Sequence, residues 1–357
     1  MDKNFSLSSI IRPHILTLTP YSSARDEYTG TEGIFLDANE NPIGSVVAES
    51  YNRYPDPYQA DIKHKLAPLK GVRPAQLFLG NGSDEPIDLL VRASCTPGQD
   101  RILIMPPTYG MYEVSASIND VPITKVPLTP DFMVDTEAVL AAITPETKIV
   151  WVCSPNNPTA NLVQADAVFT LLKEFNGLVV VDEAYIDFAS TESWTRHLDE
   201  YPNLVVLQTF SKAWGLASLR LGMCFASEEL IRILNKIKPP YNISGPTQQL
   251  LLNALDEVEN KNQMVREVLH ERDLLRTMLT GLPLVKKVHP SDANFLLVQF
   301  DEAKEVMNYL LSEKIIVRDR SRVILCEGCL RITVGTRQEN ETLVETLKKY
   351  QQKTVAA

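Results

Sequence analysis

The feature that most constrains the fold is a regular alternation of short apolar runs with helix-like segments between residues 77 and 226. The helix-like segments include Asp84 to Ala93, Thr136 to Ala142 and Asp166 to Phe175. Strands and helices that alternate at this spacing form βαβ units, whose strands make a mostly parallel sheet. The runs are apolar throughout, as expected for strands buried on both faces. The expected strands are Leu77–Leu79, Ile102–Met105, Ile123–Leu128, Ile149–Val152, Leu178–Val181, Leu204–Leu207 and Leu221–Ala226.

The chain beyond residue 226 changes character and predicts a second, smaller domain. Residues 247–280 are rich in Leu and in opposite charges, which favours long helices. Prolines and glycines are scattered through the first 45 residues, which we expect to be irregular. After Gly281, a short helix (Ala303–Glu313) is expected among the strands Val285–Val288, Phe295–Phe300, Ile315–Arg318 and Cys329–Val334. We therefore predict an α/β fold with an N-terminal arm (1–44), a large domain around a mostly parallel sheet (45–275) and a small α+β domain (276–357).

The composition of the 357 residues is that of an ordinary globular protein, with 44% hydrophobic and 22% charged residues. The net charge of −10 argues against binding to nucleic acid, which needs a basic face, and against an anionic membrane surface. No stretch has the length and apolarity of a membrane span or a signal peptide. The five cysteines are scattered, which suits the reducing cytoplasm. Cys326 and Cys329 form a CxxC without a second pair of ligands, so we interpret both as structural.

Polar side chains follow three successive strands of the expected sheet. Asn157, Asp182 and Lys212 each come just after a strand, at intervals of 25 and 30 residues, about one βα unit each. In an open parallel sheet, ligands bind beyond the carboxyl ends of the strands. The sequence therefore brings an amide, a carboxylate and an amine to one edge. At the same edge, Gly82 and Ser83 open a helix, and a helix N-terminus of this kind can hold a phosphate.

This set of groups meets the requirements of pyridoxal phosphate. A lysine amine can form a Schiff base, and a carboxylate can keep the pyridine nitrogen protonated, so that the ring withdraws electrons from the substrate. Arg220 and the turn at Ser83 offer partners for the phosphate. Each residue also has an ordinary interpretation, with Asp182 and Ser83 as helix caps and Lys212 as a solvated loop lysine. Their order along one edge favours the cofactor site.

Further motifs extend along nearly the whole chain, from about Thr19 to Arg337. They are residues 36–42, Arg53-Tyr54-Pro55, Pro106-Pro107-Thr108-Tyr109-Gly110-Met111-Tyr112, residues 154–159, Asp182-Glu183-Ala184-Tyr185, Ser211-Lys212-Ala213, residues 215–217, residues 219–222 and Leu330-Arg331-Ile332-Thr333-Val334-Gly335-Thr336. Together they resemble the class I/II aminotransferases of fold type I. The motifs at residues 106–112 and 330–336 resemble the histidinol-phosphate branch of that family. The resemblance implies an aspartate-aminotransferase-like fold.

The resemblance implies cofactor roles, residue by residue. Lys212 would bind the cofactor covalently and later shuttle a proton, and Asp182 would pair with the pyridinium. Tyr185 and Asn157 would hold the ring oxygen, and Tyr109 would stack on the ring. The phosphate would lie at the helix start formed by Ser83, Asp84 and Glu85, with Ser211 and Arg220 as its other contacts.

The resemblance also implies substrate contacts and a homodimer. Arg331 matches the family arginine that grips the substrate anion, and a guanidinium fork fits a carboxylate or a phosphate. Asn157, Arg318 and Tyr21 are further candidates for substrate binding, the last two at the ester phosphate. Tyr54 matches a tyrosine that reaches the cofactor phosphate of the partner subunit in this family.

The expected reaction is transamination between L-histidinol phosphate (or imidazole-acetol phosphate) and 2-oxoglutarate (or glutamate) in histidine biosynthesis. An aromatic or broad-range amino-acid aminotransferase, or a threonine-phosphate decarboxylase-like enzyme, would use the same scaffold. A non-catalytic protein is disfavoured because every expected polar group is present, and a dinucleotide-binding dehydrogenase because no Gly-x-Gly-x-x-Gly follows a strand. One departure from the family is Ala160, where glycine usually follows Asn-Pro-Thr. Glycine permits backbone angles that alanine avoids, so the shape of this loop is in question.

Overall fold

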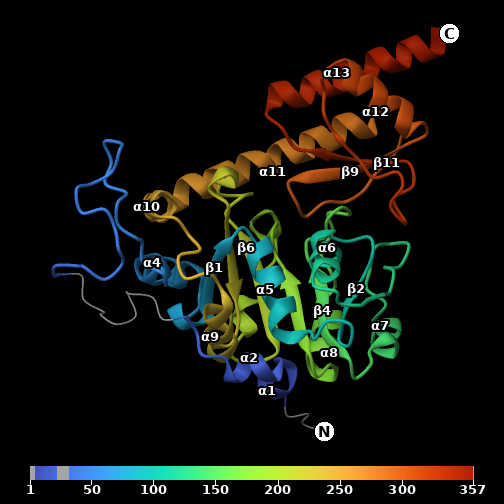
Figure 1. Cartoon of the computed structure of the whole chain (residues 1–357). Helices are drawn as coiled ribbons and strands as arrows, with labels where there is room; N and C mark the ends of the chain where they lie inside the picture. The colour runs from blue at the N-terminus through green and yellow to red at the C-terminus, as the bar shows by residue number, and fades with distance from the viewer. Residues whose placement is uncertain (1–4, 22–31, 357) are drawn as a thin grey trace.

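Two β-sheets organise the chain in the computed structural model, which describes residues 5–21 and 32–356 (Figure 1). The larger sheet contains β1 (Leu77–Asn81), β2 (Arg101–Ile104), β3 (Ile123–Lys125), β4 (Thr147–Cys153), β5 (Leu178–Asp182), β6 (Leu204–Thr209) and β7 (Leu221–Phe225). Their order is β1-β7-β6-β5-β4-β2-β3, and β7 alone among them runs in the direction opposite to the other six. This confirms the predicted mostly parallel sheet.

The large sheet is buried on both faces, as its apolar strands predicted. In β5, Leu178 and Val180 belong to one hydrophobic cluster, while Val179 and Val181 belong to the cluster on the opposite face. The first cluster lies under α5 (Asp84–Ser94), α6 (Met111–Ile118) and α9 (Glu228–Ile237), and the second lies under α4 (Ala60–Lys70), α7 (Thr136–Ala142) and α8 (Ala165–Glu174). The helices around this sheet are α4 (Ala60–Lys70), α5 (Asp84–Ser94), α6 (Met111–Ile118), α7 (Thr136–Ala142), α8 (Ala165–Glu174), α9 (Glu228–Ile237) and α10 (Gly245–Ala254).

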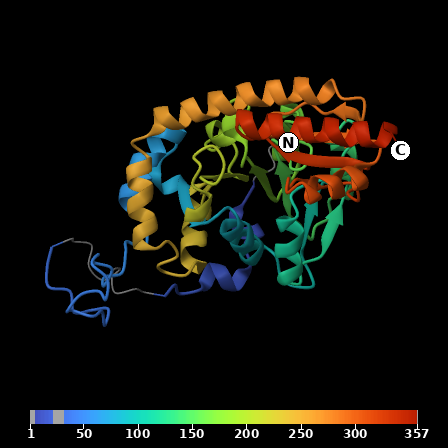
Figure 2. The same ribbon diagram turned by 90° about the horizontal axis from the view of Figure 1, so that it is seen from above.

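The smaller sheet is antiparallel, with the order β10-β11-β9-β8. Its strands are β8 (Val285–Val288), β9 (Phe295–Phe300), β10 (Arg318–Asp319) and β11 (Cys329–Thr333). Three helices pack on it around a third cluster, namely α11 (Val258–Thr280), α12 (Ala303–Ser312) and α13 (Arg337–Ala356). From above, α11 and α13 lie side by side (Figure 2). The expected domain boundary at residue 275 falls inside α11 and stays a prediction.

The N-terminal residues differ from the expected irregular chain. Two short helices form there, α1 (Leu7–Ile10) and α2 (Pro13–Thr17). Leu7, Ile10, Ile11 and Ile15 are buried in the cluster beneath α5 and α9. The backbone is also tied to the body, because Arg12 donates its N–H to the carbonyl of Ala93 at 2.9 Å. The prediction of an irregular start is wrong for this stretch, since its apolar side chains gain burial by docking.

Some elements of the small domain and the sheet rim also differ from their expected limits. The third strand stops at Lys125 rather than Leu128, and the strand expected at Ile315–Arg318 is β10 (Arg318–Asp319). Helices α6 and α13 were not expected.

Over the described residues, none of the helices is both long and apolar enough to span a membrane. All five cysteines are free and buried, and no group of His, Cys, Asp and Glu in the described ranges could hold a metal.

One close approach between strands fixes the turn at the end of β1. In the β1–β7 register, Gly80 lies opposite Gly222. A Cβ atom at Gly222 would lie 2.2 Å from the backbone carbon of Gly82 and 2.3 Å from the nitrogen of Ser83. Only glycine fits beneath this turn, and the turn leads directly into α5.

Candidate functional site

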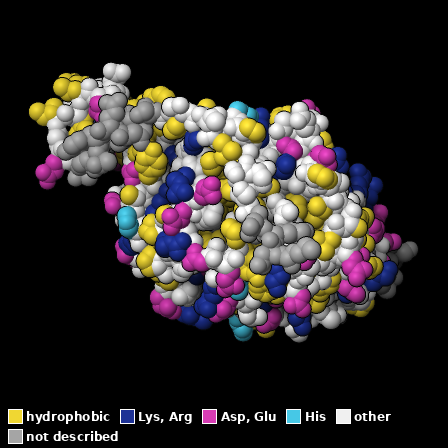
Figure 3. Space-filling model, turned by 90° about the horizontal axis from the view of Figure 1, so that it is seen from below, with side chains coloured by type: hydrophobic (Ala, Val, Ile, Leu, Met, Phe, Trp, Pro, Cys, Tyr) yellow, Lys and Arg dark blue, Asp and Glu magenta, His cyan; other side chains and the backbone are white. Residues whose placement is uncertain are grey.

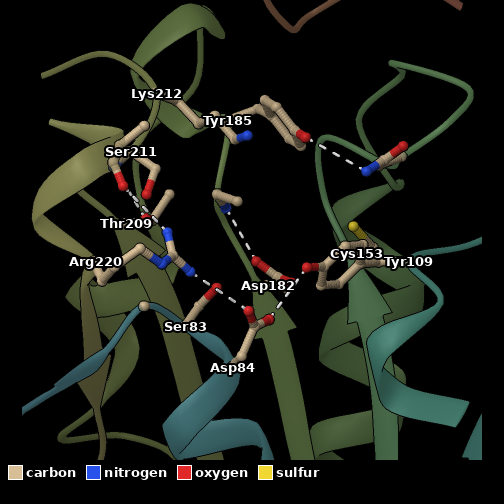
Figure 4. Close-up of a pocket in the computed structure, with 14 residues that line it drawn as sticks. Ser83, Asp84, Tyr109, Cys153, Asp182, Tyr185, Thr209, Ser211, Lys212 and Arg220 are labelled. Atoms are coloured by element: carbon tan, nitrogen blue, oxygen red, sulfur yellow. Dashed lines mark hydrogen bonds and ion pairs between the residues drawn. The ribbon is translucent and has the colours of Figure 1, made fainter. Parts of the chain in front are cut away.

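A pocket of about 260 Å³ lies at the carboxyl ends of the parallel strands (Figure 4). Asp182 closes β5, and Lys212 follows β6, and both side chains line this one pocket. The other sequence-predicted residues in its wall are Ser83, Asp84, Tyr109, Asn157, Tyr185, Ser211 and Arg220. Gly82, Cys153, Ala184, Thr209 and Ala217 complete the lining.

The carboxylate of Asp182 is buried, with 2% of the residue exposed. Its Oδ1 accepts a hydrogen bond from the backbone N–H of Ala184 at 3.1 Å, and its Oδ2 accepts one from the hydroxyl of Tyr112 at 2.6 Å. Burial raises the pKa of Asp182 to about 6, and the two hydrogen bonds oppose this rise because they favour the ionised form. A cationic group placed in the pocket would therefore find a preformed counter-ion.

Tyr112 is a member of the site that reasoning from the sequence did not identify as functional. It lies in α6, is fully buried, and stacks on Trp151 of β4 with ring centroids 4.6 Å apart. Tyr109 comes three residues earlier, and the two rings meet edge to face at 5.6 Å. Tyr109 lies just before α6, which begins at Met111, so no helical spacing in the sequence signalled the role of Tyr112.

Lys212 is reachable from solvent through the mouth of the pocket. Partial burial lowers the pKa of its amine, and the nearby positive charges of Arg331 and Arg220 lower it further. Its Nζ lies 5.6 Å from the centroid of the Tyr185 ring. Within the described part of the chain, no carboxylate forms an ion pair with it. A lower pKa increases the fraction of neutral amine, which is the nucleophilic form.

The opposite wall of the pocket suits an anion. Gly82 adopts φ +68°, and a Cβ atom there would lie 2.7 Å from a terminal nitrogen of Arg220. Arg220 lies 3.7 Å from Asp84, whose other oxygen accepts a hydrogen bond from the Tyr109 hydroxyl at 3.1 Å. The N–H groups at the start of α5 and the guanidinium thus border one hollow (Figure 4).

Glu85 does not line the pocket, although it belongs to the same helix start. Its Oε2 accepts hydrogen bonds from the backbone N–H of Asn81 and from the amide of Asn242. The carboxylate therefore stabilises the turn from below. A direct contact of Glu85 with a cofactor stays a prediction.

Arg331 connects the small sheet to the pocket. One of its terminal N–H groups donates to Oδ1 of Asn157, and the amide of Asn157 donates to the Tyr185 hydroxyl at 3.4 Å. Its guanidinium also lies 5.3 Å from the centre of the Phe295 ring. Arg318 is exposed and lies directly opposite Arg331 in the β10–β11 pairing.

Tyr54 and Tyr21 lie away from the pocket of their own chain. Tyr54 is half exposed and stacks on Tyr241, with ring centroids 4.5 Å apart. Its backbone N–H donates to Glu40, which also pairs with Arg53 at 2.6 Å. Tyr21 has 75% of its surface exposed.

Ala160 occupies the position where the family resemblance predicted glycine. Its backbone adopts φ +69°, in the left-handed region, and its side chain is fully buried. Its N–H donates to the carbonyl of Asn156, and its own carbonyl accepts from the N–H of Asp292 in the small domain, both at 2.7 Å. The loop therefore holds an alanine in a conformation that usually favours glycine.

Taken together, the pocket can bind an anion beside Arg220, a cationic ring atom beside Asp182 and a carbonyl carbon beside Lys212. The family model for aminotransferases of class I and II matches residues 33–347, most of the chain. The chain belongs to the class I and II aminotransferases.

Two relatives of this aminotransferase are both named histidinol-phosphate aminotransferase. This chain is 60% identical over 346 residues to the histidinol-phosphate aminotransferase of Cytophaga hutchinsonii. The aligned region covers 97% of this chain and 99% of the relative. The enzyme of the same name from Christiangramia forsetii is 47% identical, again over 97% and 99% of the two chains.

A solved structure supports the fold of this aminotransferase. The histidinol-phosphate aminotransferase of Sinorhizobium meliloti, determined in complex with pyridoxal-5′-phosphate, superposes with a TM-score of 0.78 and 24% identity. The match covers 88% of this chain and 90% of that one.

Proposed function

We propose that this aminotransferase uses pyridoxal phosphate to transfer the amino group between L-histidinol phosphate and 2-oxoglutarate, in histidine biosynthesis. The observation that carries the proposal is the shared pocket of Asp182, Lys212 and Arg220. The substrate follows from the relatives at 60% and 47% identity over nearly the full chain, which are named for it.

The residues present fit the cofactor. Asp182 is a buried carboxylate with room for a cation beside it, and Lys212 is an amine whose pKa is lowered. Gly82 leaves space for a phosphate next to Arg220, since a Cβ atom there would collide with the guanidinium. Ser83 and Ser211 add donors at the same wall. When bound, pyridoxal phosphate supplies an electron-withdrawing ring that stabilises negative charge on the substrate carbon.

The side chains around the ring divide the work of the reaction. Asp182 would hold a proton on the pyridine nitrogen, because that positive charge would pair with the buried carboxylate. Lys212 would act as the base that removes the proton from the substrate Cα. Tyr185 and Asn157, which are joined by a hydrogen bond, would orient the ring oxygen, and Arg331 would hold the anionic end of each substrate.

A homodimer is part of the proposal. Apolar side chains in the stretch before α4 are almost fully exposed, with Ile34, Leu36, Ile43 and Val46 all above 85%. Figure 1 shows this stretch extended away from the body, and Figure 3 shows hydrophobic side chains on the lobe at upper left. An exposed apolar segment of this kind is typical of an interface. In the dimer, Tyr54 would reach the cofactor phosphate of the partner subunit.

The experiment that tests the function compares three amino donors with the holoenzyme: histidinol phosphate, phenylalanine and threonine phosphate. We expect histidinol phosphate to give the highest kcat/KM. In this reaction 2-oxoglutarate accepts the amino group and becomes glutamate. A large preference for phenylalanine would contradict the substrate assignment, and release of carbon dioxide from threonine phosphate would contradict the reaction type. A cytoplasmic location and the absence of nucleic-acid binding stay predictions from the sequence.

A further inference from the structure

We propose that Arg320 is an additional substrate-binding residue, which contacts the phosphate ester of the amino donor and sets the preference for phosphorylated substrates. The proposal rests on the proposed function, because it concerns the donor of that reaction. It assigns Arg320 together with Arg331 and Arg318 to one anion site above the pocket.

The strand pairing places these arginines on one face. Arg318 lies opposite Arg331, and Asp319 lies opposite Leu330. The pairing continues for one more residue, because the N–H of Arg320 donates to the carbonyl of Cys329 at 2.9 Å. Side chains at alternate positions of paired strands share a face, so Arg320 stands on the face of Arg331. That face looks toward the pocket, since Arg331 bonds there with Asn157.

No counter-ion among residues 5–21 and 32–356 explains the position of Arg320. It is partly buried, and its Nε is shielded from solvent without a hydrogen-bond partner. Among the described residues, no carboxylate forms an ion pair with it. Its sequence neighbour Asp319 is engaged elsewhere, because its Oδ1 accepts the N–H of Ser321 at 2.8 Å. The guanidinium therefore keeps a hydrogen-bond donor, the Nε–H group, that is shielded from water and available to a ligand.

The charges around Arg320 indicate that its guanidinium would bind an anion. Burial lowers the pKa of Arg320, and the like charges of Arg331 and Arg318 lower it further. Burial raises the pKa of the Tyr185 hydroxyl, and the positive charges of Arg331 and Arg320 act against this rise. Three neighbouring cations repel one another unless an anion neutralises them. This local cluster of positive charge contrasts with the net charge of −10 of the whole chain.

The chemistry of the anion is best matched by a phosphate monoester. A carboxylate carries one charge and two oxygens, which the fork of Arg331 alone can satisfy. A phosphate monoester carries nearly two charges and three oxygens, and it can accept from several guanidinium groups at once. Arg320 should therefore matter for histidinol phosphate and much less for glutamate.

The test compares the holoenzyme with Arg320→Gln and with the control Arg322→Gln. Arg322 is exposed in the same loop, so its replacement removes the same charge two residues away. The quantity measured is the ratio of kcat/KM for histidinol phosphate to that for unphosphorylated histidinol. We expect Arg320→Gln to lower this ratio roughly 10- to 100-fold, the range for a lost hydrogen bond to a charged group. The change should lie in KM, with kcat and the KM for glutamate within about three-fold.

A second measurement separates this proposal from the proposed function. Methyl phosphate should perturb the absorbance of the cofactor bound to wild-type enzyme, and Arg320→Gln should weaken this binding while Arg322→Gln does not. If histidinol phosphate is not a substrate at all, the proposed function fails and the methyl phosphate titration still tests Arg320. Arg320→Lys should recover part of the ratio. Equal losses for phosphorylated and unphosphorylated donors, or equal effects of Arg320→Gln and Arg322→Gln, would overturn the proposal.

Discussion

Replacing Tyr112 with phenylalanine removes one hydroxyl from a buried pair and leaves the packing in place. The phenyl ring keeps its stack on Trp151, at 4.6 Å between centroids, so the fold should tolerate the change. What is lost is the 2.6 Å hydrogen bond to the ionised carboxylate of Asp182. The variant therefore isolates the part of Tyr112 that acts on the cofactor through Asp182.

The size of the effect follows from the state of Asp182. Its pKa is already raised to about 6 by burial, even with the Tyr112 hydrogen bond in place. A hydrogen bond to a charged group is worth about 1.5–3 kcal/mol, which equals about one to two pKa units. In Tyr112→Phe the pKa of Asp182 should rise to about 7–8, so that much of the carboxyl is protonated at neutral pH.

The sign of the pH dependence follows from linkage. In the proposed function pyridoxal phosphate would pair with the ionised carboxylate, so its affinity should fall as pH drops below the pKa of Asp182 in the apoprotein. In wild type this fall begins near pH 6, the pKa of Asp182. In the variant it should begin about one to two units higher. The affinity defect should be roughly 10- to 100-fold below pH 6 and should fade above about pH 8, where both apoproteins hold an ionised Asp182.

The assay is a titration of the apoprotein with pyridoxal phosphate between about pH 5.5 and 9, followed by absorbance. The control is Tyr109→Phe, which removes a hydroxyl from the same pocket that donates to Asp84 instead. In this control we expect the affinity for pyridoxal phosphate to fall at nearly the same pH as in wild type. Parallel affinity curves for wild type and Tyr112→Phe, displaced by a constant factor at every pH, would refute the reasoning.

Four further predictions concern the covalent link, the substrate fork and two positions of the backbone. Lys212→Ala should reduce turnover below about one-thousandth, because the general base is lost, and borohydride reduction of wild type should label Lys212 and no other lysine. Arg331→Ala should raise KM for both substrates, since each presents an anion to the same fork, and unchanged values for both would contradict that role. Ala160→Gly should change the free energy of unfolding by less than about 1 kcal/mol, as measured by urea unfolding. Glycine removes the backbone strain that alanine has at φ +69°, and this gain offsets the loss of a buried methyl group worth about 0.8 kcal/mol. Gly222→Ala should destabilise the apoprotein by about 1–3 kcal/mol and weaken cofactor binding, because its methyl would strike the turn at Gly82, and thermal unfolding with cofactor titration checks both.

Much of the large domain could be predicted because buried parallel strands are local features of the sequence. A run such as Leu178–Val181 is apolar at every position, and this marks a strand covered on both faces without reference to its neighbours. The residue after such a strand lies at the carboxyl edge of the sheet wherever the strand is placed. For that reason the meeting of Asn157, Asp182 and Lys212 in one pocket could be expected before any coordinates.

Contacts between elements far apart in the chain were decided by tertiary structure. The hydroxyl of Tyr112 meets Asp182 only because α6 packs over β4 and β5 with one particular rotation. Arg320 faces the pocket only because β10 pairs with β11 in one register, and a shift of one residue would turn it to the other face. Rotation and register depend on packing summed over many partners, so no local pattern encodes them. The sequence by itself therefore determined which edge of the sheet carries the chemistry, whereas the three-dimensional packing decided which side chains tune it.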